Sequence, residues 1–199
     1  SVTIKLSDEG FYNVIVGCTD MGTGCDTIIA QFVADSLDTD IDNIAVFGVD
    51  TDTSPYDSGS YASSTTYLTG MAAVKAAEQM REKLLQLAAK ILEEDITKLE
   101  FDGKRVFCEE TGKEVSLFDL ATASMVNNEI ALEVTYSHSS PVSPPPFMAA
   151  CAEVEVDPET GAIELLDYTA CVDCGTVVNT NLARVQTEGG LLQGIGMTL

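Results

Sequence analysis

Basic residues are scarce in this sequence. Only 10 Lys and Arg stand against 32 Asp and Glu, and the formal net charge is −22. Proteins that bind nucleic acid or anionic membranes neutralise phosphate groups with clustered Lys and Arg, so we expect neither partner. Apolar runs long enough to cross a bilayer are lacking, as is the basic-then-apolar pattern of a secretory signal at the N-terminus. These absences predict a soluble, cytoplasmic protein that does not contact membranes.

The chain of 199 residues is long enough for one good core, or one core with an appendage, but short for two full-sized domains. It begins within a strand-like alternation at Val2, Ile4 and Leu6, and it stops inside an apolar, glycine-bearing run. We therefore expect a fragment of a longer protein.

Histidine and closely spaced cysteines are also scarce, which argues against a metal site. The six cysteines are too few for a disulfide scaffold, so we expect free thiols that are mostly buried. Cys171 and Cys174 form a C-x-x-C pair, but His138 is the single histidine and no second ligand pair lies at useful spacing. No metal ligand is predicted.

Apolar periodicity predicts an α+β fold, with a mixed, mainly antiparallel sheet and helices packed mostly on one face. Four prolines at 139–146 indicate an extended connector and a possible subdivision of the chain. The expected strands are 2–6, 11–16, 44–49, 99–101, 105–107, 132–136, 147–156 and 162–172. The expected helices begin near 25–27, 68 and 117, and a last one at 182–199 is loosened by Gly189 and Gly190.

A glycine-rich loop, GCTDMGTGCDT at 17–27, lies between the second strand and the first helix. Its three glycines allow close backbone approach to a ligand, and main-chain N–H groups at a helix start can hold an anion without a basic side chain. The loop lacks the third glycine of a dinucleotide fingerprint and the lysine of a Walker loop. On its own it is better explained as a structural turn than as a ligand-binding loop.

A second polar loop, DTDTSPYDSGSYASSTT at 50–66, opens into the longest predicted helix. Asp50, Asp52 and Ser54 resemble the start of a calcium loop, but Pro55 stands at the position that requires glycine, and Tyr61 where a bidentate Glu should close the site. Together with QTEGGLLQGIG at 186–196, the two loops suggest one shared anion. No catalytic residue can be assigned.

Four ordered motifs resemble the molybdenum hydroxylase family, which comprises the molybdopterin-binding subunits of xanthine dehydrogenases, aldehyde oxidases and their relatives. DMGTGCDT at 20–27 is similar to the family's acidic-x-Gly-Gln-Gly-x-x-Thr loop, and 50–70 is similar to its DTD…GT.AS…G segment. EVEVDPETG and the following residues at 153–179, and QTEGGLLQGIGMTL at 186–199, look like two further family stretches. The resemblance covers nearly all of residues 1–199 and places them in the second molybdenum-binding region.

The resemblance implies a cofactor site with three walls and a molybdopterin, plain or in dinucleotide form. Thr23 stands where many members have Gln, and Thr180 replaces the proline that usually follows the residue matching Asn179. The implied cofactor-binding residues are Gly22, Thr23 and Gly24 at the pterin or its phosphate, Ala62, Ser63, Ser64 and Thr65 at the phosphate or pterin, and Gln193 as a hydrogen-bonding group.

The implied enzyme oxidises an N-heterocycle or an aldehyde with water as the oxygen source. It would pass electrons to iron–sulfur clusters and FAD on other domains or subunits, which makes these and the remainder of the molybdenum subunit the expected partners. The family's general-base glutamate lies beyond this chain, so the fragment alone is predicted to be inactive. The alternative is a stand-alone, non-catalytic binding or interaction module.

Overall fold

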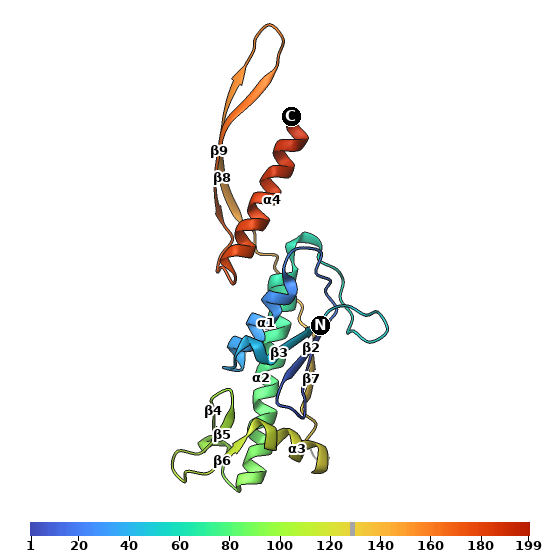
Figure 1. The fold of residues 1–199 in the computed structure, drawn as a ribbon, viewed down its shortest axis with the longest axis vertical. Helices are drawn as coiled ribbons and strands as arrows, with labels where there is room; N and C mark the ends of the chain where they lie inside the picture. The colour runs from blue at the N-terminus through green and yellow to red at the C-terminus, as the bar shows by residue number, and fades with distance from the viewer. Residues whose placement is uncertain (128–129) are drawn as a thin grey trace. The chain divides into compact units, whose positions relative to one another are not determined.

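The structure, a computed structural model, describes residues 1–127 and 130–199, and it divides into two compact units (Figure 1). The first unit comprises residues 1–140 and the second residues 141–199. Within the described ranges, no helix combines the length and the apolar character needed to span a bilayer.

A four-stranded sheet forms the centre of the first unit, with strand order β3-β2-β1-β7. β1 pairs antiparallel with both β2 and β7, whereas β2 and β3 run parallel. A parallel pair needs a crossover connection, and helix α1 (Cys25–Ser36) provides it. The strands are β1 (Val2–Leu6), β2 (Tyr12–Val16), β3 (Ile44–Phe47) and β7 (Glu133–Tyr136).

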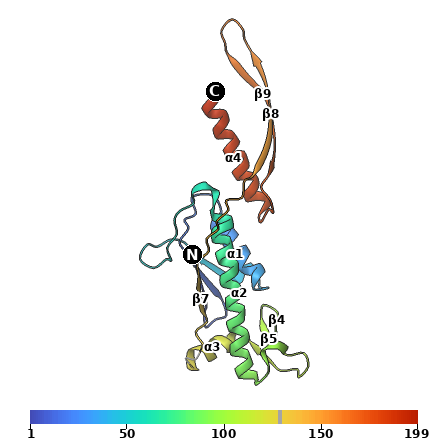
Figure 2. The same ribbon diagram turned by 180° about the vertical axis from the view of Figure 1, so that it is seen from behind.

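Helices α1 and α2 (Thr65–Leu92) lie beside this sheet (Figure 2). Every second residue of β2 is buried, and α2 contributes a stripe of small and aliphatic residues to the same core. Gly70 allows close approach, because a β-carbon there would lie 2.5 Å from the Phe32 ring. The opposite sheet face is open, and Lys5, Asn13, Ile15 and Phe47 line a shallow groove there. Helices on one face of a mostly antiparallel sheet confirm the expected fold class.

A small antiparallel sheet of order β4-β5-β6 follows α2 and leads into helix α3. Arg81 of α2 secures it by donating to the Phe101 carbonyl at 3.1 Å and to the Asp38 carboxylate at 2.9 Å. Gly103 lies so close to Asp38 that a β-carbon would be 1.8 Å from the Asp38 carbonyl oxygen. The elements are β4 (Glu100–Phe101), β5 (Arg105–Phe107), β6 (Glu114–Ser116) and α3 (Leu117–Asn127).

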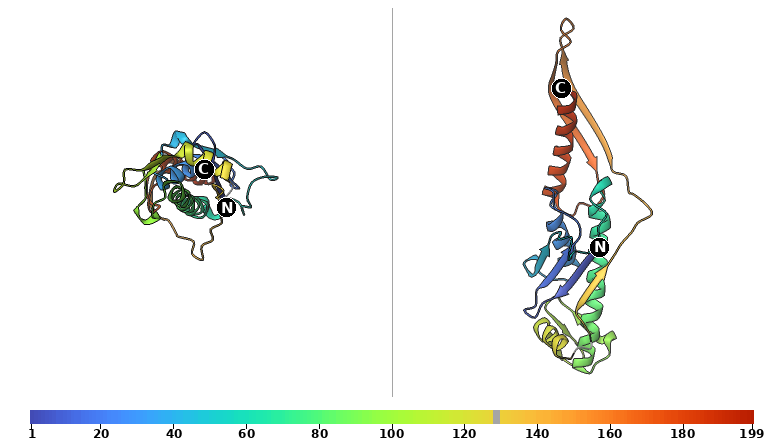
Figure 3. Two further views of the ribbon diagram at one scale, coloured as in Figure 1. Left: turned by 90° about the horizontal axis from the view of Figure 1, so that it is seen from below. Right: turned by 90° about the vertical axis from the view of Figure 1, so that its right-hand side faces the viewer.

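The second unit is an antiparallel hairpin, β8 (Phe147–Val156) and β9 (Ile163–Asp173), with helix α4 (Thr180–Thr198) alongside (Figure 3). No residue of α4 is buried. Every residue of β8 is exposed, including Met148 and Val154. The hairpin and α4 therefore bury little apolar surface within this unit.

Several expectations about local structure need correction. The last helix is not loosened at Gly189 and Gly190: α4 continues through both, because glycine costs a helix only about 1 kcal/mol per residue and does not interrupt its hydrogen bonds. Strand β6 was not predicted, since Val115 is its single apolar residue and sets no alternation. The expectation that most thiols are buried is correct only for the first unit, where Cys18, Cys25 and Cys108 are buried. In the second unit, Cys151, Cys171 and Cys174 are exposed.

Candidate functional site

The glycine-rich loop connects β2 to the first turn of α1. Gly22 and Gly24 both adopt the left-handed conformation, with φ of 99° and 76°. Gly24 is the N-terminal cap of α1. Because glycine has no side chain, the amides of the first turn receive no side-chain capping bond from it. Glycine is required here because other residues rarely adopt these torsion angles.

The Asp20 side chain closes this loop by accepting hydrogen bonds from its backbone. Its Oδ1 accepts hydrogen bonds from the backbone N–H groups of Gly22 at 2.9 Å and Gly24 at 3.1 Å. These bonds to backbone amides, led by that from Gly22, lower the pKa of Asp20 below its usual value. The donors that the sequence suggested for an external anion thus hold an internal carboxylate in this structure. The signal was present, since an Asp two residues before a glycine is typical of a turn closed by its own side chain.

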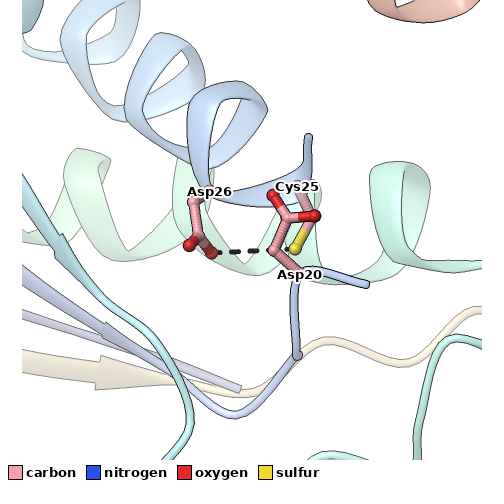
Figure 4. Close-up of side chains that lie close together, drawn as sticks. All are labelled: Asp20, Cys25 and Asp26. Carbon is pink, nitrogen blue, oxygen red and sulfur yellow. Dashed lines mark hydrogen bonds between the residues drawn. The ribbon is translucent and has the colours of Figure 1, made fainter. Parts of the chain in front are cut away.

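Three potential metal ligands lie together at the start of α1, namely Asp20, Cys25 and Asp26 (Figure 4). Their ligand atoms all lie within 4.8 Å of one another, and the Cys25 thiol donates to Asp26 Oδ1 at 3.7 Å. Burial raises the pKa of Cys25 to about 12, and only a thiolate binds metal well. Because Asp20 is already bonded to backbone amides, this group is not arranged as an open metal site.

The second loop reaches α2 through two consecutive left-handed residues. Ala62 and Ser63 each have φ of 54°, a conformation that costs a residue with a β-carbon on the order of 1–3 kcal/mol. Ser64, the N-terminal cap of α2, is 5% exposed and makes no side-chain capping bond. The first turn of α2 contains no acidic residue. Backbone strain beside an uncapped helix start is typical of a site that binds an anion through main-chain amides.

The two loops lie against each other. A β-carbon on Gly17 would be 2.2 Å from the Pro55 carbonyl oxygen and 2.8 Å from the Asp57 β-carbon. Asp57 in turn accepts a hydrogen bond from Thr69 Oγ1 of α2 at 3.3 Å and lies 3.8 Å from the Ser1 amino group. Helices α1 and α2 consequently begin at the same end of the first unit (Figures 1 and 2).

The structure therefore brings two of the three expected walls into one region. Gly22, Thr23 and Gly24 lie at the start of α1, and the segment 62–65 lies at the start of α2. Gln193 belongs to the second unit, on an exposed part of α4. The sequence did not predict Asp20 and Asp57 as structural groups of this region.

The electrostatic setting excludes recognition of an anion by basic side chains from these loops. No Lys or Arg occurs between Lys5 and Lys75, whereas Asp20, Asp26 and Asp57 lie around the two helix starts. An anion bound there must be held by backbone N–H groups, hydroxyl groups and helix dipoles.

A family model described as a molybdopterin cofactor-binding domain matches residues 1–199. The chain belongs to this family. This finding confirms the resemblance to the molybdenum hydroxylases and identifies molybdopterin as the family's cofactor.

Named relatives agree with the family. The chain is 37% identical over 197 residues to "Probable hypoxanthine oxidase XdhD" of Escherichia coli strain K12, covering 98% of this chain and 20% of the relative. It is 32% identical over 202 residues to the 6-hydroxypseudooxynicotine dehydrogenase complex subunit gamma of Paenarthrobacter nicotinovorans, covering 98% and 25%. This molybdopterin-binding chain thus spans about a fifth to a quarter of their lengths.

Solved structures share the fold. Carbon monoxide dehydrogenase from Oligotropha carboxidovorans superposes with a TM-score of 0.82 at 31% identity, over 96% of this chain and 24% of that one. Quinoline 2-oxidoreductase from Pseudomonas putida 86 gives a TM-score of 0.82 at 26% identity, over 98% and 26%. The α+β architecture is therefore that of molybdenum hydroxylase large subunits.

Proposed function

We propose that this chain forms part of the molybdopterin site of a larger, xanthine dehydrogenase-like molybdenum hydroxylase. The observation that carries the proposal is the start of α2, where Ala62 and Ser63 are strained and Ser64 leaves the helix without a side-chain cap. Strain of this kind persists where function requires it, and here the chain also matches a cofactor-binding family over its full length.

The residues at the two helix starts fit an anionic cofactor. Ala62, Ser63, Ser64 and Thr65 would bind a phosphate group through backbone N–H groups and hydroxyls at the positive end of the α2 dipole. No carboxylate lies in the first turn of α2 to repel it. Ser63, with a positive φ, is followed by the right-handed Ser64, and such alternation turns successive amides toward one side, a known arrangement for holding anions.

The glycine loop has a different role in the proposal. Because Asp20 already accepts from Gly22 and Gly24, this loop would form a wall that the pterin approaches closely, and Thr23 would offer its hydroxyl. Gln193 would hydrogen-bond the cofactor from α4. When bound, molybdopterin supplies the metal centre for a two-electron oxidation in which water provides the oxygen atom.

The wider enzyme is also part of the proposal. Substrates would be N-heterocycles or aldehydes, and iron–sulfur and flavin domains or subunits would accept the electrons. Relatives are named as subunits of larger assemblies, such as the carbon monoxide dehydrogenase large chain and the nicotine 6-hydroxylase large subunit. The exposed apolar residues of the second unit support packing against the remainder of such a subunit. The fragment alone contains no complete active site and would not turn over substrate.

Molybdenum and phosphorus content of the full-length protein tests the proposal, and a charge placed at the start of α2 localises it. Thr66→Glu adds a carboxylate to the first turn, which favours the helix through its dipole but repels a bound phosphate. Gln86→Glu adds the same charge in the C-terminal third of α2, at an exposed position, and serves as the matched control.

We expect Thr66→Glu to lower molybdenum content about tenfold at unchanged or higher thermal stability, and Gln86→Glu to retain wild-type content, since a tenfold change is about 1.4 kcal/mol of binding free energy. Equal molybdenum content in both variants would refute the assignment of α2. A full-length protein without molybdenum and phosphorus, expressed where the cofactor is made, would instead support the non-catalytic module.

A further inference from the structure

The β8–β9 hairpin has one face without a charged residue. Alternate residues along a strand point to opposite sides, and residues directly opposite each other in an antiparallel pair point to the same side. The register therefore sorts the hairpin into two faces. The first, called here the apolar face, consists of Met148, Ala150, Ala152, Val154 and Val156 of β8 with Ile163, Leu165, Tyr168, Ala170 and Val172 of β9.

The other side of the hairpin, called here the acidic face, carries the carboxylates of both strands. Glu153 lies opposite Asp167, and Glu155 lies opposite Glu164. Like charges in such pairs repel each other, and water and salt screen them only while the face is exposed. Burial of the acidic face against apolar residues would therefore be costly, whereas burial of the apolar face would not.

A β-bulge keeps the two faces separate along the whole hairpin. The register shifts by one residue between Glu153 and Val154, which leaves Leu166 of β9 without an opposite residue. Without this shift, the alternation would place Glu164 on the apolar face and Ile163 among the carboxylates. Bulges are built features of a sheet rather than defects, so the one inserted residue indicates that an uncharged face is required.

Little within the second unit covers the apolar face. Helix α4 runs alongside the hairpin (Figure 3), and the half-buried residues of the hairpin all belong to β9. On the β8 side, Met148, Val154 and Val156 are 59%, 48% and 52% exposed. A contiguous exposed apolar surface of this kind is typical of an interaction site.

We propose that the apolar face docks the second unit onto the part of the same polypeptide that lies outside residues 1–199, at an apolar surface rimmed by Lys and Arg. Relatives such as the E. coli protein are about four to five times as long as this chain, so most of such a subunit is available as the partner. A second copy is a poor partner, because residues 141–199 carry eight Asp and Glu against the single Arg184, and two such units would repel each other. The proposal rests on the longer subunit of the proposed function, but not on cofactor binding.

Neighbouring residues of β8 provide a matched test, because they point to opposite faces. Ala150→Cys places a thiol on the apolar face and Ala149→Cys places one on the acidic face, each in a Cys151→Ser background of the full-length protein. A covered thiol reacts only when the interface opens, so we expect maleimide to label Ala150→Cys on the order of 100-fold more slowly than Ala149→Cys. The two rates should become equal in urea. Ala152→Cys repeats the test on the apolar face, and native rates equal to that of Ala149→Cys would overturn the proposal.

Photo-crosslinking identifies the covering surface. The photoreactive amino acid p-benzoylphenylalanine replaces Tyr168 on the apolar face or, as the control, Thr169 on the acidic face. We expect only the first to cross-link, at the mass of one subunit, to a peptide outside residues 1–199 that contains apolar residues near Lys or Arg. A product of twice the subunit mass, or a cross-link to another kind of subunit or to residues 1–140, would overturn the proposal.

Molybdenum content of the same samples separates this proposal from the proposed function. A protein that lacks molybdenum but protects Ala150→Cys contradicts only the cofactor assignment. A molybdenum-loaded protein in which Ala150→Cys reacts as fast as Ala149→Cys contradicts only the docking surface.

Discussion

Gly17 and Pro55 are in backbone contact, and this contact joins the two loops of the candidate cofactor site. A β-carbon at residue 17 would lie 2.2 Å from the Pro55 carbonyl oxygen, well inside the sum of van der Waals radii. The separation between the loops is therefore set by the absence of a side chain at one position.

Gly17→Ala should force the loops apart. We expect a loss of about 1–3 kcal/mol in unfolding free energy, as for other overpacked sites, measured by urea denaturation of the full-length protein. Gly48→Ala is the matched control, because no atom lies within 4 Å of a β-carbon there. A Gly17→Ala protein as stable as Gly48→Ala would show that the loops do not pack as described.

Gly103→Ala should disrupt the packing of the small sheet on the turn after α1. The new methyl group would lie 1.8 Å from the Asp38 carbonyl oxygen, and φ at this residue is +84°. Gly112→Ala separates the two causes, since Gly112 also has a positive φ, of 69°, but has no neighbour within 4 Å of a β-carbon. We expect about 1–2 kcal/mol for Gly112→Ala from backbone conformation alone, and a clearly larger loss for Gly103→Ala. Equal losses measured by thermal unfolding would contradict the steric explanation.

Tyr12→Phe should leave the protein as stable or make it more stable. The Tyr12 hydroxyl is buried without a hydrogen-bond partner among the described residues, and an unsatisfied buried group costs about 1–3 kcal/mol. A loss of more than about 1 kcal/mol on its removal would show that the hydroxyl has a partner, such as an internal water.

The same residue predicts an alkaline effect. Burial raises the pKa of Tyr12 above the value of the unfolded chain, so only the unfolded state ionises readily above pH 10. Stability from this residue is complete below the unfolded pKa and is lost as pH rises above it. The wild type should therefore lose stability above pH 10 more steeply than Tyr12→Phe, and parallel curves from urea denaturation would contradict this.

Asp20→Asn should weaken the start of α1 without changing its shape. The amide oxygen can still accept from Gly22 and Gly24, but without the charge that stabilises these bonds. Because the pKa of Asp20 is lowered in the folded state, its contribution is present above the unfolded pKa and disappears as pH falls below it. The stability difference between wild type and variant should thus be largest near pH 7 and vanish near pH 2. A difference that does not change with pH would exclude this role.

Periodicity in the sequence predicted the elements that build the core. β1 and β2 alternate apolar and polar residues, and α2 carries a long apolar stripe. Both patterns arise because one side of each element is buried in the core, so they can be recognised without knowing the tertiary structure. Gly189 and Gly190 misled the prediction, because a local propensity of about 1 kcal/mol does not decide whether a helix continues.

The details of the candidate site depend on tertiary context that the sequence does not carry. Nothing about Ala62 and Ser63 as residue types indicates a left-handed backbone, since both normally avoid it; the surrounding loop imposes it. The role of Asp20 in closing the glycine-rich loop was readable from its spacing to Gly22, but the contact between Gly17 and Pro55 joins segments far apart in the chain. Four ordered motifs nevertheless identified the family correctly.

The lack of buried residues in α4 has a practical use. Arg184 is the single basic residue of the second unit, and the chain from 114 to 183 contains no Lys or Arg at all. Trypsin can therefore cut the second unit only after Arg184, and only while α4 is uncovered. Under the proposed packing against the remainder of a longer subunit, the fraction of chains cleaved at this bond would measure how many molecules still have α4 exposed, so cleavage would report assembly.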